Sequence, residues 1–132
     1  MVGALRSEVI ERKELSKATK LGVINAMVVP TLLYGSETWT LQRRHRSKIQ
    51  AMEMRYLRRV EGVTRMDRLT NEDIRRRLEV EAVLEVADRK KKEWRKKIEE
   101  MPQERLVRRV FEEEVCGKRP RGRPRKRWRD DI

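Results

Sequence analysis

The sequence is poor in the residues that build most chemical sites. It has one cysteine, Cys116, and one histidine, His45, in 132 residues. A single thiol excludes an internal disulfide and a cysteine-based metal cluster, and a single histidine excludes a zinc knuckle on ligand count. His45 stands among arginines with no neighbouring carboxylate in sequence, so we interpret it as a surface residue rather than a general base.

Long hydrophobic runs are also missing. The first fifteen residues lack the apolar centre of a signal peptide. The uncharged stretch 21–36 contains Asn25, Pro30 and Gly35, and it is shorter than the roughly 18–20 residues that a membrane span needs. We interpret this stretch as a buried helix, and we expect an intracellular protein with no membrane partner.

Acidic residues are outnumbered, and the excess charge is unevenly placed. Lys and Arg total 35 against 22 Asp and Glu, which gives a formal net charge of +13. Residues 118–129 hold eight basic residues and no acid. A field of this kind favours a polyanionic partner such as DNA or RNA. An anionic membrane is the weaker alternative, because the stretch has no apolar face to insert.

Apolar spacing predicts helices and no strand. We expect an N-cap at Ser16, a kink or end at Pro30, a stop at Gly35, a C-terminal cap at Gly62 and an N-cap at Thr70. The expected helices span residues 4–14, 17–29, 43–60, a short segment after 70, 82–101 and 103–114. The fold class is therefore all-α, with a small irregular bundle of about five helices in residues 1–116 and a disordered basic tail in residues 117–132.

Each expected helix has a candidate buried stripe. The stripes are Leu21, Ile24 and Val28; Ile49, Met52, Tyr56 and Val60; Ile74 and Leu78; Val83, Ala87, Trp94, Ile98 and Met101; and Leu106, Val107, Val110 and Phe111. Because its apolar residues lie on several sides, the 17–29 helix is expected at the centre of the fold. Lys90 and Lys91 interrupt the stripe of the 82–101 helix, so we expect that helix to project partly into solvent.

The tail contains the sequence Pro-Arg-Gly-Arg-Pro at residues 120–124, which resembles the AT-hook, a short DNA-binding motif. Gly122 would let the backbone lie on the floor of a narrow A·T-rich minor groove, with Arg121 and Arg123 extended along it. A nuclear-localisation cluster and a nonspecific phosphate-binding arm are the alternatives. Trp128 could stack on a base or anchor the tail onto the helices.

Four motifs in order resemble the region downstream of the catalytic palm in reverse transcriptases of non-LTR retrotransposons. They are residues 26–41 (AMVVPTLLYGSETWTL), 51–60 (AMEMRYLRRV), 70–74 (TNEDI) and 117–130 (GKRPRGRPRKRWRD). The family usually has an arginine-Trp-x-Gly-His sequence shortly before a Met-Pro pair. Here Trp94 is present, but Lys96 and Lys97 occupy the glycine and histidine positions.

The resemblance implies a thumb-like helical region in residues 1–116 that holds a template–primer duplex through its backbone, in a nuclear protein. It also implies that the catalytic palm lies upstream of Met1, so we expect no polymerase activity from the chain alone, no cofactor and no small-molecule substrate. Self-association, or contact with the palm, would cover leftover apolar surface. The predicted nucleic-acid-binding residues are Arg55, Arg58, Arg59, Arg119, Arg121, Gly122, Arg123, Pro124, Arg125, Lys126 and Arg127.

Two alternatives to this interpretation remain. An independent chromatin-associated protein could use the AT-hook-like tail to bind DNA and its helices to bind a protein partner. An enzyme is the less favoured class, because we find no catalytic or metal-binding constellation. The only Asp-Asp pair, Asp130-Asp131, follows Arg129 in a charged tail, where solvation is expected rather than metal binding.

Overall fold

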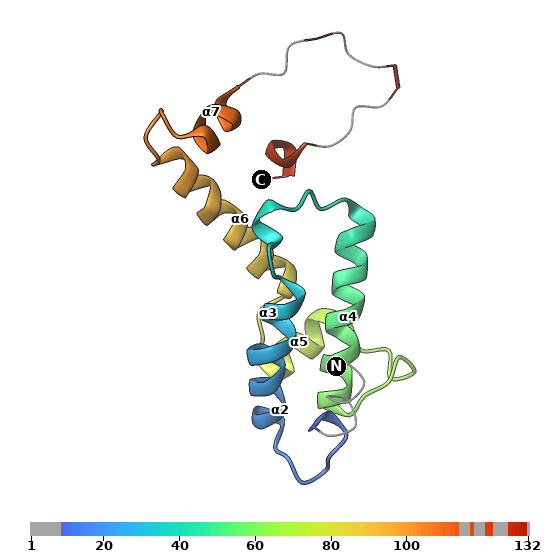
Figure 1. Cartoon of the computed structure of the whole chain (residues 1–132). Coiled ribbons are helices and arrows are strands. Elements are labelled where there is room, and N and C mark those ends of the chain that lie inside the picture. The colour runs from blue at the N-terminus through green and yellow to red at the C-terminus, as the bar shows by residue number, and fades with distance from the viewer. Residues whose placement is uncertain (1–8, 114–116, 118–120, 123–126, 132) are drawn as a thin grey trace.

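The computed structural model of the chain describes residues 9–113, 117, 121–122 and 127–131 (Figure 1). These residues form helices and connecting turns, and no strand occurs among them. The all-α prediction is therefore confirmed for the described part of the chain. In the same part, no helix is both long and apolar enough to cross a membrane.

The first long helix is built from three consecutive segments. These are α2 (Lys17–Val23), the π-helical turn η2 (Ile24–Val28) and α3 (Val29–Leu32). The Ser16 hydroxyl accepts from the Thr19 N–H at 3.1 Å, which confirms the predicted N-cap. The prediction of a helix up to residue 14 is wrong for residues 11–14, which form a bend and a turn, and residues 4–8 lie outside the described part.

The helix passes through Pro30 instead of ending there. In the wide turn before it, the Val29 N–H donates to the Ile24 carbonyl, five residues back. Such a change of hydrogen-bond pattern goes with the proline, which lacks an N–H and crowds the preceding turn. Gly35 then stops the helix, with a φ of 69° in the left-handed region that glycine tolerates best. A 3-10 turn, η3 (Ser36–Thr38), follows.

The longest helix is α4 (Arg43–Glu61), close to the predicted 43–60. Gly62, with a φ of 80°, caps its C-terminus as expected. At its N-terminus the Gln42 N–H donates to Nδ1 of His45 at 3.4 Å, so the single histidine takes part in capping. Ile49, Tyr56 and Val60 are buried as predicted. The stripe is wider than expected, because Met54 and Leu57 are buried as well.

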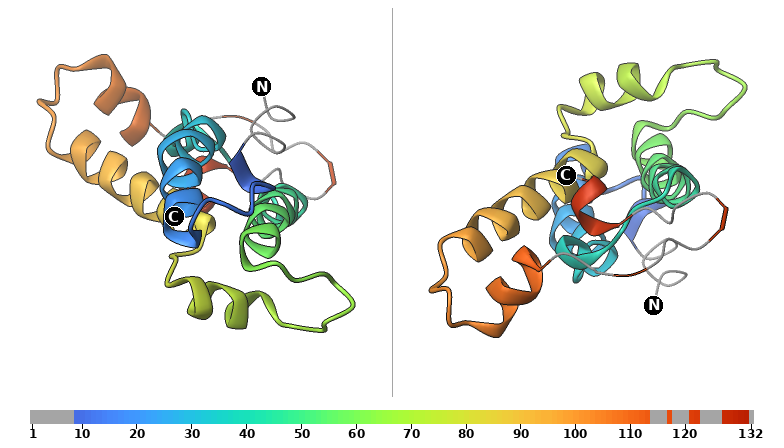
Figure 2. Two further views of the ribbon diagram at one scale, coloured as in Figure 1. Left: turned by 90° about the horizontal axis from the view of Figure 1, so that it is seen from below. Right: turned by 90° about the horizontal axis from the view of Figure 1, so that it is seen from above.

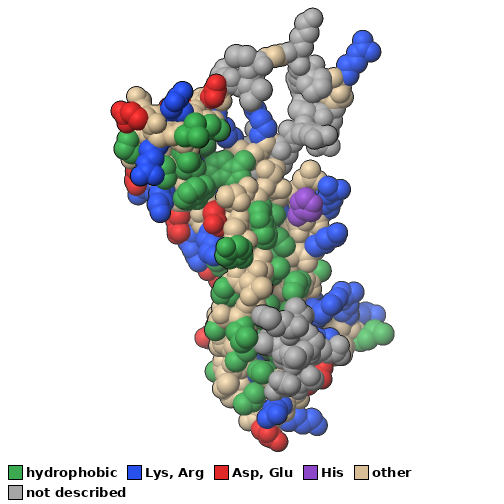
Figure 3. Space-filling model, viewed as in Figure 1, with side chains coloured by type: hydrophobic (Ala, Val, Ile, Leu, Met, Phe, Trp, Pro, Cys, Tyr) green, Lys and Arg blue, Asp and Glu red, His purple; other side chains and the backbone are tan. Residues whose placement is uncertain are grey.

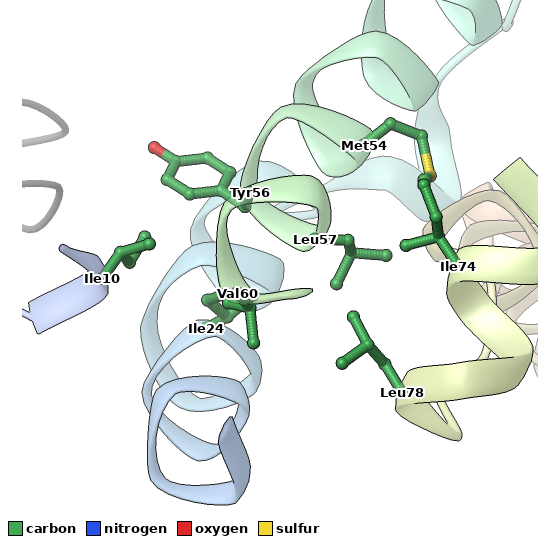
Figure 4. Close-up of a cluster of buried hydrophobic side chains, with 8 residues drawn as sticks. All are labelled: Ile10, Ile24, Met54, Tyr56, Leu57, Val60, Ile74 and Leu78. Carbon is green, nitrogen blue, oxygen red and sulfur yellow. The ribbon is translucent and has the colours of Figure 1, made fainter. Parts of the chain in front are cut away.

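Two hydrophobic clusters hold the helices together. The first joins α2 and η2 to α4 and α5 (Asn71–Leu78), and Figure 4 shows its side chains meeting between these helices. It contains Ile10, Ile24, Met54, Tyr56, Leu57, Val60, Ile74 and Leu78. The second joins the end of the first helix to the starts of α4 and α6 (Val83–Glu99), and it contains Leu33, Leu41, Ile49, Val83 and Ala87. The first helix is less central than predicted, since Ile24 is its one buried residue before Leu33.

The seam of α6 runs through a lysine. Val83, Ala87, Lys91 and Ile98 are all buried, and Lys91 is only 1 % exposed. The prediction that Lys91 interrupts the stripe is therefore wrong, whereas Lys90 is exposed. Lys91 lies one turn after Ala87 on the same face, so its four-carbon stem can fill the position of an apolar side chain.

The last α-helix, α7 (Leu106–Glu112), is shorter and more exposed than predicted. Leu106, Val107 and Val110 are 69 %, 47 % and 61 % exposed, so the prediction that they are buried is wrong. The reason is that α7 leans on the end of α6, far from α5 and from both clusters (Figure 2). Polar contacts hold it there, since Nη1 of Arg108 donates to the carbonyls of Glu99 and Met101.

The chain returns to the helices at its C-terminal end. Trp128 begins a 3-10 turn, η4 (Trp128–Asp131), and its indole N–H donates to the Glu37 carbonyl at 2.7 Å. Its ring meets Phe111 edge to face, with centroids 5.9 Å apart. Of the two predicted roles of Trp128, the structure shows the anchor. The prediction of a disordered tail otherwise falls largely on residues outside the described part.

Candidate nucleic-acid interface

The solvent face of α4 carries a row of basic side chains. Arg44, Lys48, Arg55 and Arg59 recur at intervals of four and seven residues, which places them on one side of the helix, opposite the buried Glu53 and Leu57. Space-filling Figure 3 shows Lys and Arg side chains along this outer edge of the molecule. The row exists because α4 buries its apolar stripe against the other helices, so its arginines point into water.

The C-terminal half of this row borders a hollow of about 570 Å³ between α4 and the segment 62–71. We call this hollow the arginine groove. Its basic lining residues are Arg55, Arg58 and Arg59 from α4 and Arg65 from the following segment. Its other lining residues are Ser47, Gln50, Ala51, Met54, Val63, Thr64 and Asn71, so no acid borders it among the described residues.

The three predicted residues on α4 have different roles. Arg55 is exposed and Arg59 is half-buried, and both line the groove. Nη2 of Arg58 donates to the Leu69 carbonyl at 3.3 Å and to Oδ1 of Asn71 at 2.9 Å. Arg58 therefore ties α4 to the start of α5. It lines the groove from a fixed position, and its buried Nε has no partner in the described part of the chain.

Several arginines elsewhere in the described part are paired with an acid. Arg46 binds Asp88, Arg75 binds Glu53, Arg89 binds Glu81, Arg95 binds Glu99 and Arg108 binds Glu112. For Arg55, Arg59 and Arg65, by contrast, no ion pair or side-chain hydrogen bond occurs with any described residue. The one acid of α4 before its last turn, Glu53, is buried against Arg75. The groove therefore keeps an uncompensated positive charge.

The segment 62–70 contributes residues that the sequence analysis did not single out. Arg65 lines the groove, and Met66 and Arg68 beside it are exposed. A signal was present in the sequence, since two arginines follow a helix cap within six residues. Without the structure, nothing showed that this turn lies beside the arginines of α4.

The predicted residues of the tail are only partly described. Arg121 and Arg127 are exposed, and Gly122 has a φ of 103°, in the region that favours glycine. Arg119, Arg123, Pro124, Arg125 and Lys126 lie outside the described residues, as does Cys116. The AT-hook-like interpretation of this segment therefore stays a prediction.

Among the described residues, no group of three or more His, Cys, Asp or Glu is arranged to hold a metal ion. Fold and surface together define a basic, all-helical protein with an arginine-lined groove. Comparisons of the chain with known protein families, curated proteins and solved structures found no match. The resemblance to retrotransposon reverse transcriptases therefore stays a prediction too.

Proposed function

We propose that the chain binds the sugar–phosphate backbone of a nucleic-acid duplex through α4, in the manner of a thumb-like region of a retroelement RNA-directed DNA polymerase. The observation that carries the proposal is the arginine groove, whose Arg55, Arg59 and Arg65 have no acidic partner among the described residues. A phosphate gains more beside these unpaired arginines than beside Arg46, Arg75 or Arg89, whose charges are already balanced by an acid.

The dimensions of α4 suit one strand of a duplex. From Arg44 to Arg59 the helix rises about 22 Å, at roughly 1.5 Å per residue. A duplex advances about 3.4 Å per base pair, so the row spans roughly six base pairs, along which its basic side chains can contact phosphates. Arginine contacts to phosphate hold the duplex in place without reading its bases. The bound ligand is therefore a duplex of any sequence.

The proposal extends to two finer points. The basic segment 118–129 would add phosphate contacts, and the protein would act in the nucleus, where a retroelement polymerase meets chromosomal DNA. The resemblance in residues 26–41, 51–60 and 70–74 supports the thumb-like assignment, whereas the tail supports general nucleic-acid affinity.

The test compares two double variants that each remove two positive charges. Arg55→Ala with Arg59→Ala removes two of the four arginines that line the groove. Arg89→Ala with Arg95→Ala removes arginines paired with Glu81 and Glu99. Duplex binding is measured by fluorescence anisotropy across a range of salt concentrations. Log K falls with log salt, and each lost phosphate contact makes this slope shallower by about 0.9. The slope of the groove variant should therefore be shallower than that of the wild type by about 1.8.

The paired-arginine variant should keep the wild-type slope, because its arginines are proposed to make no phosphate contact. Circular dichroism confirms that both variants remain helical. Equal losses of slope in the two variants would mean that net charge, not the groove, drives binding, and would refute the proposal. A wild-type slope in the groove variant would refute it as well.

A further inference from the structure

The turn that joins α4 to α5 is fixed at both ends. Val63 and Leu69 are partly buried and pack against the first hydrophobic cluster. Arg58 donates to the Leu69 carbonyl at 3.3 Å, and this bond attaches the end of the turn to α4. Residues 64–68, which we call the tip, project between these two anchors.

The tip is also tied internally. Oδ2 of Asp67 accepts from the Thr64 N–H at 2.6 Å and from the Thr64 hydroxyl at 2.9 Å. The Met66 N–H donates to the Thr64 hydroxyl oxygen at 3.2 Å, and the Arg68 N–H donates to the Arg65 carbonyl at 3.3 Å. Arg68 has a φ of 53°, an unfavourable value for a residue with a side chain that persists only where its surroundings impose it.

This ordered tip presents an apolar side chain to water between two cations. Met66 is 90 % exposed, and Arg65 and Arg68 on either side of it are exposed too. Isolated exposed apolar residues are common on proteins. Met66 differs from an ordinary one because its backbone is held in place and because Arg65, which lines the arginine groove, and Arg68 lie within two residues of it. The one acid of the tip, Asp67, is bound to Thr64.

We propose that Met66 inserts as a wedge between base pairs of the bound duplex from its minor groove, while Arg65 and Arg68 contact the phosphates on either side. This inference rests on the duplex binding proposed above and extends it to the bases. Apolar side chains flanked by arginine or lysine are the groups by which proteins enter the minor groove and unstack a base step. A strand held in the arginine groove would bring the edge of the duplex to the tip.

The test uses short duplexes, DNA and RNA–DNA, that carry 2-aminopurine at successive positions, because the emission of this base rises when its stacking is broken. Saturating the duplex with the wild-type chain should raise the emission. Met66→Ala should abolish most of the rise and weaken binding about tenfold, the factor for losing the burial of one methionine side chain. Met66→Leu should retain both effects, and Met66→Gln should behave like Met66→Ala.

The salt dependence separates the wedge from a loss of charge contacts. Met66→Ala removes no cation, so its slope of log K against log salt should equal that of the wild type, whereas Arg65→Ala should lower the slope by about 0.9. Met66 makes almost no contact with the rest of the chain, so Met66→Ala should unfold at the wild-type temperature.

Two results would overturn the wedge and are distinguishable. If the wild-type chain binds the duplex without raising the emission, and Met66→Ala binds equally well, the wedge is wrong and the phosphate-binding groove stands. If the wild-type chain binds neither duplex, the proposed function and the wedge are both wrong. A rise in emission confined to one duplex type supports the wedge and identifies the preferred helix form.

Discussion

Glu53 offers the sharpest test of how the helices are joined. Its side chain is buried, and it accepts from Nε and Nη2 of Arg75 at 3.2 and 2.7 Å and from the Val83 N–H at 3.1 Å. One carboxylate of α4 thus binds α5 through a bidentate ion pair and binds α6 at its first turn. Hydrogen bonding to Glu53 raises the pKa of Arg75 above its ordinary value, so the guanidinium of Arg75 keeps its charge.

Glu53→Ala should lower the free energy of unfolding by about 3 kcal/mol. Removing one partner of a buried ion pair costs roughly 3–5 kcal/mol. The lower end applies because the Arg75 side chain is 14 % exposed and can turn partly toward water, although the Val83 N–H also loses its partner. The total free energy of unfolding of a chain of this size is roughly 5–15 kcal/mol, so the variant should melt roughly 10 °C lower.

The assay is urea unfolding followed by circular dichroism, with free energies compared at equal m values. Glu53→Gln keeps an oxygen for the Val83 N–H, so it should lower the free energy of unfolding by about half as much as Glu53→Ala. The matched control is Glu81→Ala, which breaks the exposed pair with Arg89 and should cost less than about 1 kcal/mol. If Glu53→Ala costs no more than Glu81→Ala, the carboxylate does not link the three helices and the reasoning is refuted.

Two further predictions concern acid stability and the C-terminal anchor. The Thr70 hydroxyl and N–H donate to Asp73, and these bonds hold the pKa of the Asp73 carboxyl below its ordinary value of 3.8. The ionised Asp73 therefore stabilises the fold above about pH 4, and this stabilisation is lost as the pH falls through the lower pKa of the folded state. Unfolding measured from pH 6 to pH 2 should therefore show a weaker acid dependence in Asp73→Asn, and identical curves would contradict this. Trp128→Ala should speed tryptic cleavage of the C-terminal segment several-fold. Trp128→Phe keeps the ring contact with Phe111 but loses the bond to Glu37, so its cleavage rate should lie between those of Trp128→Ala and the wild type. Equal cleavage of Trp128→Ala and the wild type would show that the anchor does not hold the segment.

Local signals in the sequence located the helices well. The caps at Ser16, Gly62 and Thr70 were all predicted, because each depends on hydrogen bonds or φ angles within a few residues. Arg55, Arg58 and Arg59 were predicted as nucleic-acid-binding residues, and the structure places all three along the arginine groove. Arg65, the fourth arginine of the groove, was not predicted, because its place beside α4 depends on the path of the turn.

The sequence does not show which helices lie next to one another. The apolar residues of α7 have the right spacing for burial, but spacing does not show that the neighbouring helices lie too far away to cover them. The charge of Lys91 suggests a break in the stripe, whereas its aliphatic stem lets the side chain lie in the buried face. Arg58 and Arg55 look alike in sequence, and only the carbonyl of Leu69 and the amide of Asn71 make Arg58 structural.

The contact between Trp128 and Glu37 also bears on the order in which the protein assembles. The two residues are 91 positions apart in the chain, whereas α4 and α5 are consecutive helices joined by one short turn. Contacts between distant residues close large loops and form late, after local helix pairs have docked. During synthesis the helices up to α6 can therefore settle before the anchor exists. We therefore expect the contact between Trp128 and Glu37 to form after the helices have docked, and a bulky fusion placed after Ile132 to slow that step more than the docking of the helices.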